Sequence, residues 1–174
     1  LFMEMLGQAV ESIREGKTPN MDQPLRHGAE VNLHLSALIP DDYLPDVHSR
    51  LIMYKRIANA SSSKELKELQ IEMIDRFGLL PDQVKNLFQI TELKLRAEAM
   101  NIVKIDAGVE NGRIEFAADA KVDPLTLVKM VQNQPQKYKL EGADKLRFSL
   151  NMEKTDARFN AIESLLSDLA VKTS

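Results

Sequence analysis

The sequence contains no cysteine and no tryptophan. Without cysteine the chain has neither a disulfide framework nor a thiolate nucleophile, which suits the reducing cytoplasm. It also lacks any run of about 18 apolar residues, and no basic segment precedes a short apolar one. The sequence therefore predicts neither a membrane span nor a signal peptide, and we expect a cytoplasmic protein without membrane contact.

Glycine is also scarce, and it is scattered. The seven glycines stand singly at expected helix ends and turns. Neither G-x-x-x-x-G-K-[ST] nor G-x-G-x-x-G occurs, and these are the loops whose backbone N–H groups cradle nucleotide phosphates. The sequence therefore predicts no nucleotide and no other cofactor bound by this chain.

The length and charge of the chain restrict its class. A chain of 174 residues, 44% apolar and 28% charged, is large enough for one ordinary domain with a core and an appendage. Its formal net charge is −3, whereas a domain that binds nucleic acid by itself usually has a net positive charge. Because the chain starts at Leu1, inside an apolar helical pattern, we expect a piece of a longer protein.

The apolar spacing switches repeatedly between helical and strand periods, without a βαβ rhythm. This order predicts an α+β fold in which helices pack on short antiparallel hairpins or a small sheet. The expected elements are a helix over 1–15, a linker over 17–28, a strand over 31–35, helices over 45–60, 61–78 and 81–100, a hairpin over 102–117, a helix over 123–134, a hairpin over 137–150 and a helix over 154–171.

Two of these predictions specify individual residues. The dipeptide Asn111-Gly112 favours the tight turn of the first hairpin. The helix over 45–60 is expected to bury one face, which comprises Val47, Leu51, Tyr54 and Ala58.

Metal-binding candidates cluster before and within the helix over 45–60. Asp41, Asp42, Asp46 and His48 offer oxygen and nitrogen ligands, but a divalent cation needs several of them to converge on one point. The simpler interpretation is that the aspartates form a turn and a helix N-terminus while His48 is exposed. The other histidines, His27 and His34, form no pair at ligand spacing. We therefore expect no metal site and no catalytic residues.

Strand alternation in the second hairpin separates aromatic from basic residues. Tyr138 and Phe148 belong to the inward face, and the outward face receives Lys137, Lys139, Lys145 and Arg147. Four cations on one sheet face suit contact with phosphate or with an acidic partner. They equally suit a solvated face whose edge lysines discourage aggregation.

Four acids share one face of the helix over 61–78. Glu65, Glu68, Glu72 and Asp75 follow the spacing i, i+3, i+7, i+10, at which like charges repel. The opposite face carries an apolar seam, which comprises Leu66, Leu69, Met73, Ile74 and Phe77. The acids are therefore expected to point outward, either into solvent or toward a basic partner.

Residues 39–88 carry a specific resemblance. The runs "LIPDDYLPD", "RLIMYKRI" and "IDRFGLLPD" resemble the C-terminal domain of the bacterial transcription-repair coupling factor, and the similarity extends over 29–174. By this resemblance residues 1–28 are the terminal helix and linker of the preceding translocase module. The resemblance implies that 29–174 form the C-terminal domain.

The resemblance also implies a function. The parent protein is expected to be an ATP-dependent DNA translocase that displaces stalled RNA polymerase and recruits the damage-recognition subunit of the excision-repair nuclease. Its ATP and Mg²⁺ sites would lie upstream. The C-terminal domain would be non-catalytic, and it would restrain the motor by docking on the module that binds this repair subunit. Glu72 and Asp75 match the family's docking positions, with Glu68 as a secondary contact.

Two other functions remain open. One is a nucleic-acid-binding module that uses Lys137, Lys139, Lys145 and Arg147. The other is a stand-alone hydrolase, which would need a pocket of convergent titratable groups to which nothing in the sequence points.

Overall fold

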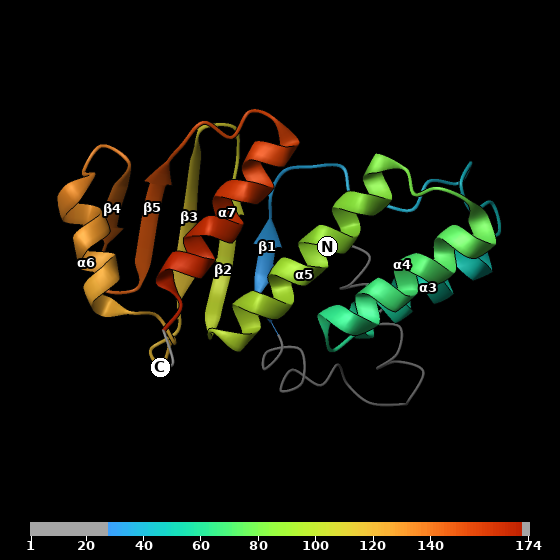
Figure 1. Cartoon of the computed structure of the whole chain (residues 1–174), viewed down its shortest axis with the longest axis horizontal. Coiled ribbons are helices and arrows are strands. Elements are labelled where there is room, and N and C mark those ends of the chain that lie inside the picture. Colours follow the sequence, from blue (N-terminus) through green and yellow to red (C-terminus); the bar gives the residue numbers. More distant parts are fainter. Residues whose placement is uncertain (1–27, 172–174) are drawn as a thin grey trace, which may run out of the picture. The chain divides into compact units, whose positions relative to one another are not determined.

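The computed structural model describes residues 28–171, which form two compact units. One unit comprises residues 39–80, and the other comprises residues 29–38 together with residues 81–171. The predicted helix over 1–15, almost all of the linker over 17–28 and His27 lie outside the described residues. Helices and one mixed sheet make up the described chain (Figure 1), so the predicted α+β class is confirmed. No helix in residues 28–171 is long and apolar enough to cross a membrane.

The first unit is a pair of helices, α3 (Val47–Asn59) and α4 (Ser63–Phe77). The side chain of Asp46 caps α3 by accepting a hydrogen bond from Ser49 N at 3.0 Å. The hydroxyl of Ser62 caps α4. Gly78 ends α4 with φ +100°, a conformation that favours glycine. These helix limits lie close to the predicted ranges 45–60 and 61–78, because capping is a local property of the sequence.

The prediction for the buried face of α3 is wrong. Val47 is 58% exposed and Leu51 is 48% exposed, whereas Met53 and Ile57 are buried. The helix begins two residues after Pro45, and both of its faces carry apolar residues, so periodicity alone chose the wrong face. In α4 the seam is largely correct, since Leu66, Leu69 and Met73 are buried, but Ile74 is 41% exposed.

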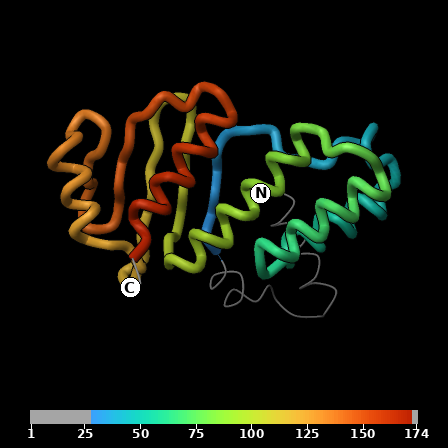
Figure 2. The backbone as a smooth tube through the Cα atoms, in the orientation of Figure 1, coloured from blue at the N-terminus to red at the C-terminus, as the bar shows by residue number. Residues whose placement is uncertain are grey.

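The second unit is a five-stranded sheet with three helices. Its strands are ordered β1-β2-β3-β5-β4, with β1 parallel to β2 and every other pair antiparallel. The strands are β1 (Glu30–Asn32), β2 (Ile102–Ala107), β3 (Asn111–Phe116), β4 (Tyr138–Glu141) and β5 (Lys145–Ser149). The helices are α5 (Asp82–Ala99), α6 (Pro124–Asn133) and α7 (Thr155–Leu169). The backbone trace shows β1 beside β2 although about 70 residues separate them (Figure 2).

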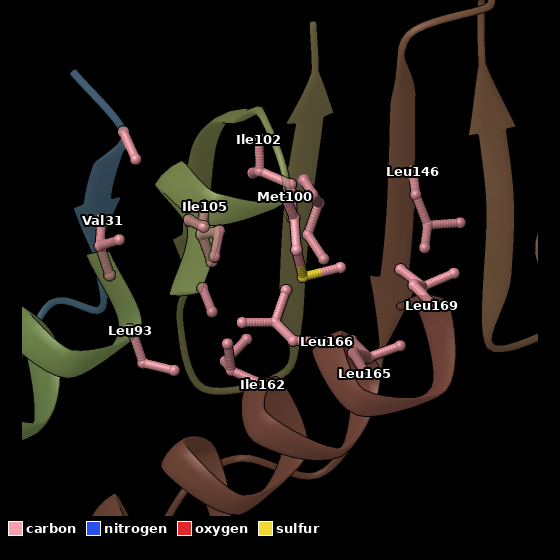
Figure 3. Close-up of a cluster of buried hydrophobic side chains, with 14 of the residues drawn as sticks. Val31, Leu93, Met100, Ile102, Ile105, Leu146, Ile162, Leu165, Leu166 and Leu169 are labelled. Atoms are coloured by element: carbon pink, nitrogen blue, oxygen red, sulfur yellow. The ribbon is translucent and has the colours of Figure 1, made fainter. Parts of the chain in front are cut away.

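One face of this sheet packs on helices. Ile105, Ile114 and Leu146 come from three neighbouring strands and are fully buried. They meet Ile162, Leu166 and other residues of α7 together with Leu93 of α5 (Figure 3). The predicted inward residues of α7 are confirmed; they are Phe159, Ile162, Leu166 and Leu169. The opposite face of the sheet therefore receives the alternate, polar residues of each strand.

The predicted turn at Asn111-Gly112 is wrong. The hairpin turns at residues 108–110, where Gly108 N donates to Asn111 O at 2.8 Å. Gly112 is instead paired in β3, opposite Ala107 and Phe148. A Cβ atom at Gly112 would overlap the Phe148 ring. Gly112 therefore allows the Phe148 ring to pack closely against β3, and it does not form a turn.

Candidate partner-docking site

The four acids of α4 do not form one uniform surface. Glu65 forms hydrogen bonds at the start of α4. Its carboxylate accepts from Ser61 N and Ser61 Oγ, both at 2.9 Å. These two bonds lower the pKa of Glu65. Ser62 Oγ satisfies the backbone N–H group of Glu65 in the first helical turn, and the Glu65 carboxylate satisfies that of Ser61, just before the helix. Glu65 is therefore a capping residue.

Glu72 is held by two arginines. Arg56 of α3 binds its carboxylate through both oxygens, Nη1 to Oε2 at 2.6 Å and Nη2 to Oε1 at 2.8 Å. Arg76, one turn further along α4, donates to Oε2 at 3.0 Å. These bonds, led by those from Arg56, lower the pKa of Glu72 to about 2. A bidentate arginine–carboxylate pair of this kind also fixes the orientation of both side chains.

The expectation that all four acids face solvent or a basic partner is therefore wrong in part, because Glu65 and Glu72 are bound within the chain. Sequence reasoning missed both arginines. The i, i+4 spacing of Glu72 and Arg76 was a usable signal. Arg56 gave none, because it is 16 residues from Glu72 and meets it only through the packing of α3 on α4.

Two acids remain available on the outward face of α4. Glu68 and Asp75 are exposed and bind no other described residue. Ile71 lies three residues after Glu68 and four residues before Asp75, so it shares their helical face, and its side chain is 68% exposed. Leu79, just beyond the helix, is 85% exposed. We call Glu68, Ile71 and Asp75 the α4 outer face; it combines two free carboxylates with an apolar side chain that has no cover among the described residues.

The predicted basic residues lie on the side of the β4–β5 hairpin that no described helix covers. Lys139 and Arg147 are directly opposite each other, and Lys145 is opposite Glu141. Lys137 precedes β4, and its carbonyl accepts from Ser149 N at 2.7 Å. Tyr138 and Phe148 are on the other face, as predicted, with Phe148 fully buried. The hairpin therefore exposes no aromatic ring pair on which bases would stack.

The metal candidates serve helix geometry. Asp46 caps α3, and its hydrogen bonds with Ser49 lower its pKa. Asp41, Asp42 and His48 are exposed. Within residues 28–171 no three His, Asp or Glu side chains are placed to hold a metal ion.

The surface of residues 28–171 includes two open hollows. The smaller, of about 180 Å³, is lined by residues of β3, β4 and β5, including Lys137, Lys139 and Arg147. The larger, of about 460 Å³, is lined by polar residues of α5 and α7, where Arg96 Nη2 donates to Ser167 Oγ at 3.0 Å.

Comparison with known proteins gives the family. The model of the TRCF domain matches residues 33–127. A transcription-repair-coupling factor of Haemophilus influenzae is 45% identical over 98% of this chain, and one of Escherichia coli is 38% identical over 97%. The chain spans about 15% of the length of each of these relatives.

Solved structures agree. The crystal structure of the C-terminal domain of a transcription-repair coupling factor superposes with a TM-score of 0.68 at 25% identity. The match covers 82% of this chain and 94% of that one. The chain therefore belongs to the TRCF domain family of transcription-repair coupling factors.

Proposed function

We propose that this chain is a non-catalytic, autoinhibitory domain of a transcription-repair coupling factor. In this proposal the parent is an ATP-dependent DNA translocase, with ATP and Mg²⁺ bound elsewhere in its sequence. It displaces stalled RNA polymerase from duplex DNA and recruits the damage-recognition subunit of the excision-repair nuclease. The α4 outer face docks on the module of the same protein that binds this repair subunit, and the docked domain restrains the motor.

The observation that supports this proposal is the pair of free carboxylates around Ile71. Glu68 and Asp75 are ready to accept arginines, and Ile71 offers the apolar contact that protein interfaces bury at their centre. Exposed charge pairs contribute under about 1 kcal/mol each, and they mainly set register and specificity. Such contacts suit a lock that must open, because a few kcal/mol of bias between two states is enough.

The two proposed docking positions differ in their surroundings. Asp75 is available, whereas Glu72 is already bound by Arg56 and Arg76. A basic side chain of the partner would share Glu72 with these arginines. Asp75 therefore has the larger expected effect on docking and is the better position to test.

The test uses the intact translocase. Asp75→Arg removes an attraction and adds a repulsion, a change of about 1–2 kcal/mol that alters a population ratio by about 5–30-fold. We expect the ATPase rate without polymerase and the binding of the damage-recognition subunit both to rise severalfold. Glu72→Arg is a poorer choice, because it would place a third arginine against Arg56 and Arg76.

The matched control is Glu110→Arg, which makes the same charge change at an exposed loop position of the sheet unit. It should leave both measurements unchanged. Equal values for Asp75→Arg, Glu110→Arg and the unaltered protein would reject docking through this face while leaving the family assignment intact.

A further inference from the structure

One face of the sheet is covered by no helix of residues 28–171, and the register sorts the charged residues of this face into rows. One row crosses all five strands with alternating sign, because each member is paired with the next. Its members are Glu30, Lys104, Glu115, Lys145 and Glu141. Lys104 Nζ is 3.8 Å from Glu30 Oε2. Opposite charges in directly opposed positions stabilise a sheet, so the alternation of sign favours this row.

The next row is different. Arg113 on β3, Arg147 on β5 and Lys139 on β4 are directly opposite one another. All three side chains are exposed, and none forms an ion pair or a side-chain hydrogen bond with a described residue. We call these three residues the cationic row. Like charges in this arrangement destabilise a sheet, so local stability gives no reason for it.

An acid borders the cationic row on one side. Asp106 of β2 is opposite Arg113, but its Oδ1 atom is 3.0 Å from His34 Nε2. The acid therefore neutralises at most the β3 end of the row. Arg147 and Lys139 lie further along the sheet, beyond Arg113.

The hollow of about 180 Å³ opens beside these two residues. Lys137 is the third cation of its lining, and Asn111 and Ser149 add polar groups. Ser149 Oγ donates to Asn111 Oδ1 at 3.0 Å, which fixes both side chains at its edge. Lysine, arginine, serine and asparagine are the side chains that commonly contact phosphate and sugar oxygens.

We propose that the cationic row binds the phosphate backbone of nucleic acid. Neighbouring strands are about 4.8 Å apart, so the row spans about 10 Å. Duplex DNA carries a charge about every 3.4 Å of helix axis on each strand, so about three phosphates of one strand lie within an axial length equal to that of the row. This surface is on the sheet and does not depend on docking through α4.

The composition of the surface favours nucleic acid over an acidic protein segment. The outward positions of β3, β5 and β4 are all polar or charged, from Asn111 to Glu141. Protein interfaces depend on buried apolar or aromatic anchors at their centre. Interfaces with DNA are polar and cationic, as this face is. The inward position of Tyr138 and Phe148 predicts contact with the backbone rather than with bases.

The experiment measures the anisotropy of a short labelled duplex titrated with the 174-residue chain at several salt concentrations. The test variant carries R113Q, R147Q and K139Q. The matched control carries K104Q, K129Q and K154Q, which change net charge equally at other exposed or compensated positions. Thermal melts by circular dichroism check that both fold, and R113K/R147K tests rescue by conserved charge.

We expect the test variant to bind at least about tenfold more weakly. Its salt slope should fall by about 2.7, since each phosphate contact contributes about 0.9. The control triple and the lysine variant should keep most of the affinity.

Three results would overturn the proposal. The first is that the unaltered chain binds neither duplex nor single-stranded DNA at low salt. The second is an equal loss in both triple variants, because net charge would then explain it. The third is displacement of the DNA by polyglutamate as effectively as by unlabelled DNA, which would indicate an acidic protein partner.

Discussion

Glu72 joins the two helices of the first unit, and Glu72→Gln measures what that junction contributes. The substitution keeps the shape of the side chain and removes the charge that Arg56 and Arg76 share. A pKa of about 2 in the folded chain, against about 4.3 when unfolded, corresponds to about 3 kcal/mol at most. The side chain is 34% exposed, and solvent screening lowers the expected contribution to about 1 kcal/mol.

The contribution should depend on pH with a definite sign. The folded pKa lies below the unfolded one, so the unfolded chain binds more protons between the two values. Stabilisation by Glu72 is therefore complete above about pH 5 and is lost as the pH falls toward 2. The glutamine variant lacks this dependence, because it does not titrate.

Urea denaturation followed by helical circular dichroism measures the difference. At pH 7 the variant should be less stable by about 1 kcal/mol, and the gap should narrow at pH 3. Glu68→Gln is the matched control, since Glu68 is on the same helix without a described partner, and it should have little effect. If the two variants behave alike at pH 7, or if the gap persists at low pH, the ion pair does not stabilise the fold as argued.

Three further substitutions test the packing by urea denaturation. Gly112→Ala puts a methyl group into the Phe148 ring and should cost about 1–3 kcal/mol; an unchanged midpoint would show that the ring shifts freely. Arg158→Met removes a buried guanidinium that donates to Leu33 O at 2.7 Å and to two other carbonyls. It should cost about 2–4 kcal/mol, because buried carbonyls lose their donors, and a neutral result would contradict their burial. Met73→Ala empties a fully buried position and should cost about 2–5 kcal/mol, unless α4 collapses onto the space.

Features that depend on local chemistry could be predicted from the sequence. The cap at Ser62 and the stop at Gly78 each rely on a few neighbouring residues, and the helix that they bound lies within the predicted range 61–78. The β4–β5 hairpin also follows its alternation, with Gly142 at φ +68° in the turn.

Features that depend on packing could not be predicted from the sequence. Gly112 has the sequence context of a turn residue, but its role is decided by Phe148, which comes from another strand. Similarly, Arg113 joins Arg147 only because β3 pairs with β5 rather than with β4, its successor in the chain. The prediction from one hairpin therefore missed Arg113, the third member of the cationic row. It also included Lys145, which is directly opposite two acids, Glu115 and Glu141.

The same distinction changes how the acidic residues should be interpreted. Spacing treats Glu72 and Asp75 as equivalent, since both belong to one helical face. Packing makes them different: a partner arginine at Glu72 competes with a bidentate contact from Arg56, whereas one at Asp75 meets an unoccupied carboxylate. The net gain from a new ion pair is the new attraction minus the contact that it displaces, so in the proposed docking Glu72 would contribute less than its charge suggests. Its ion pair with Arg56 instead holds α3 against α4.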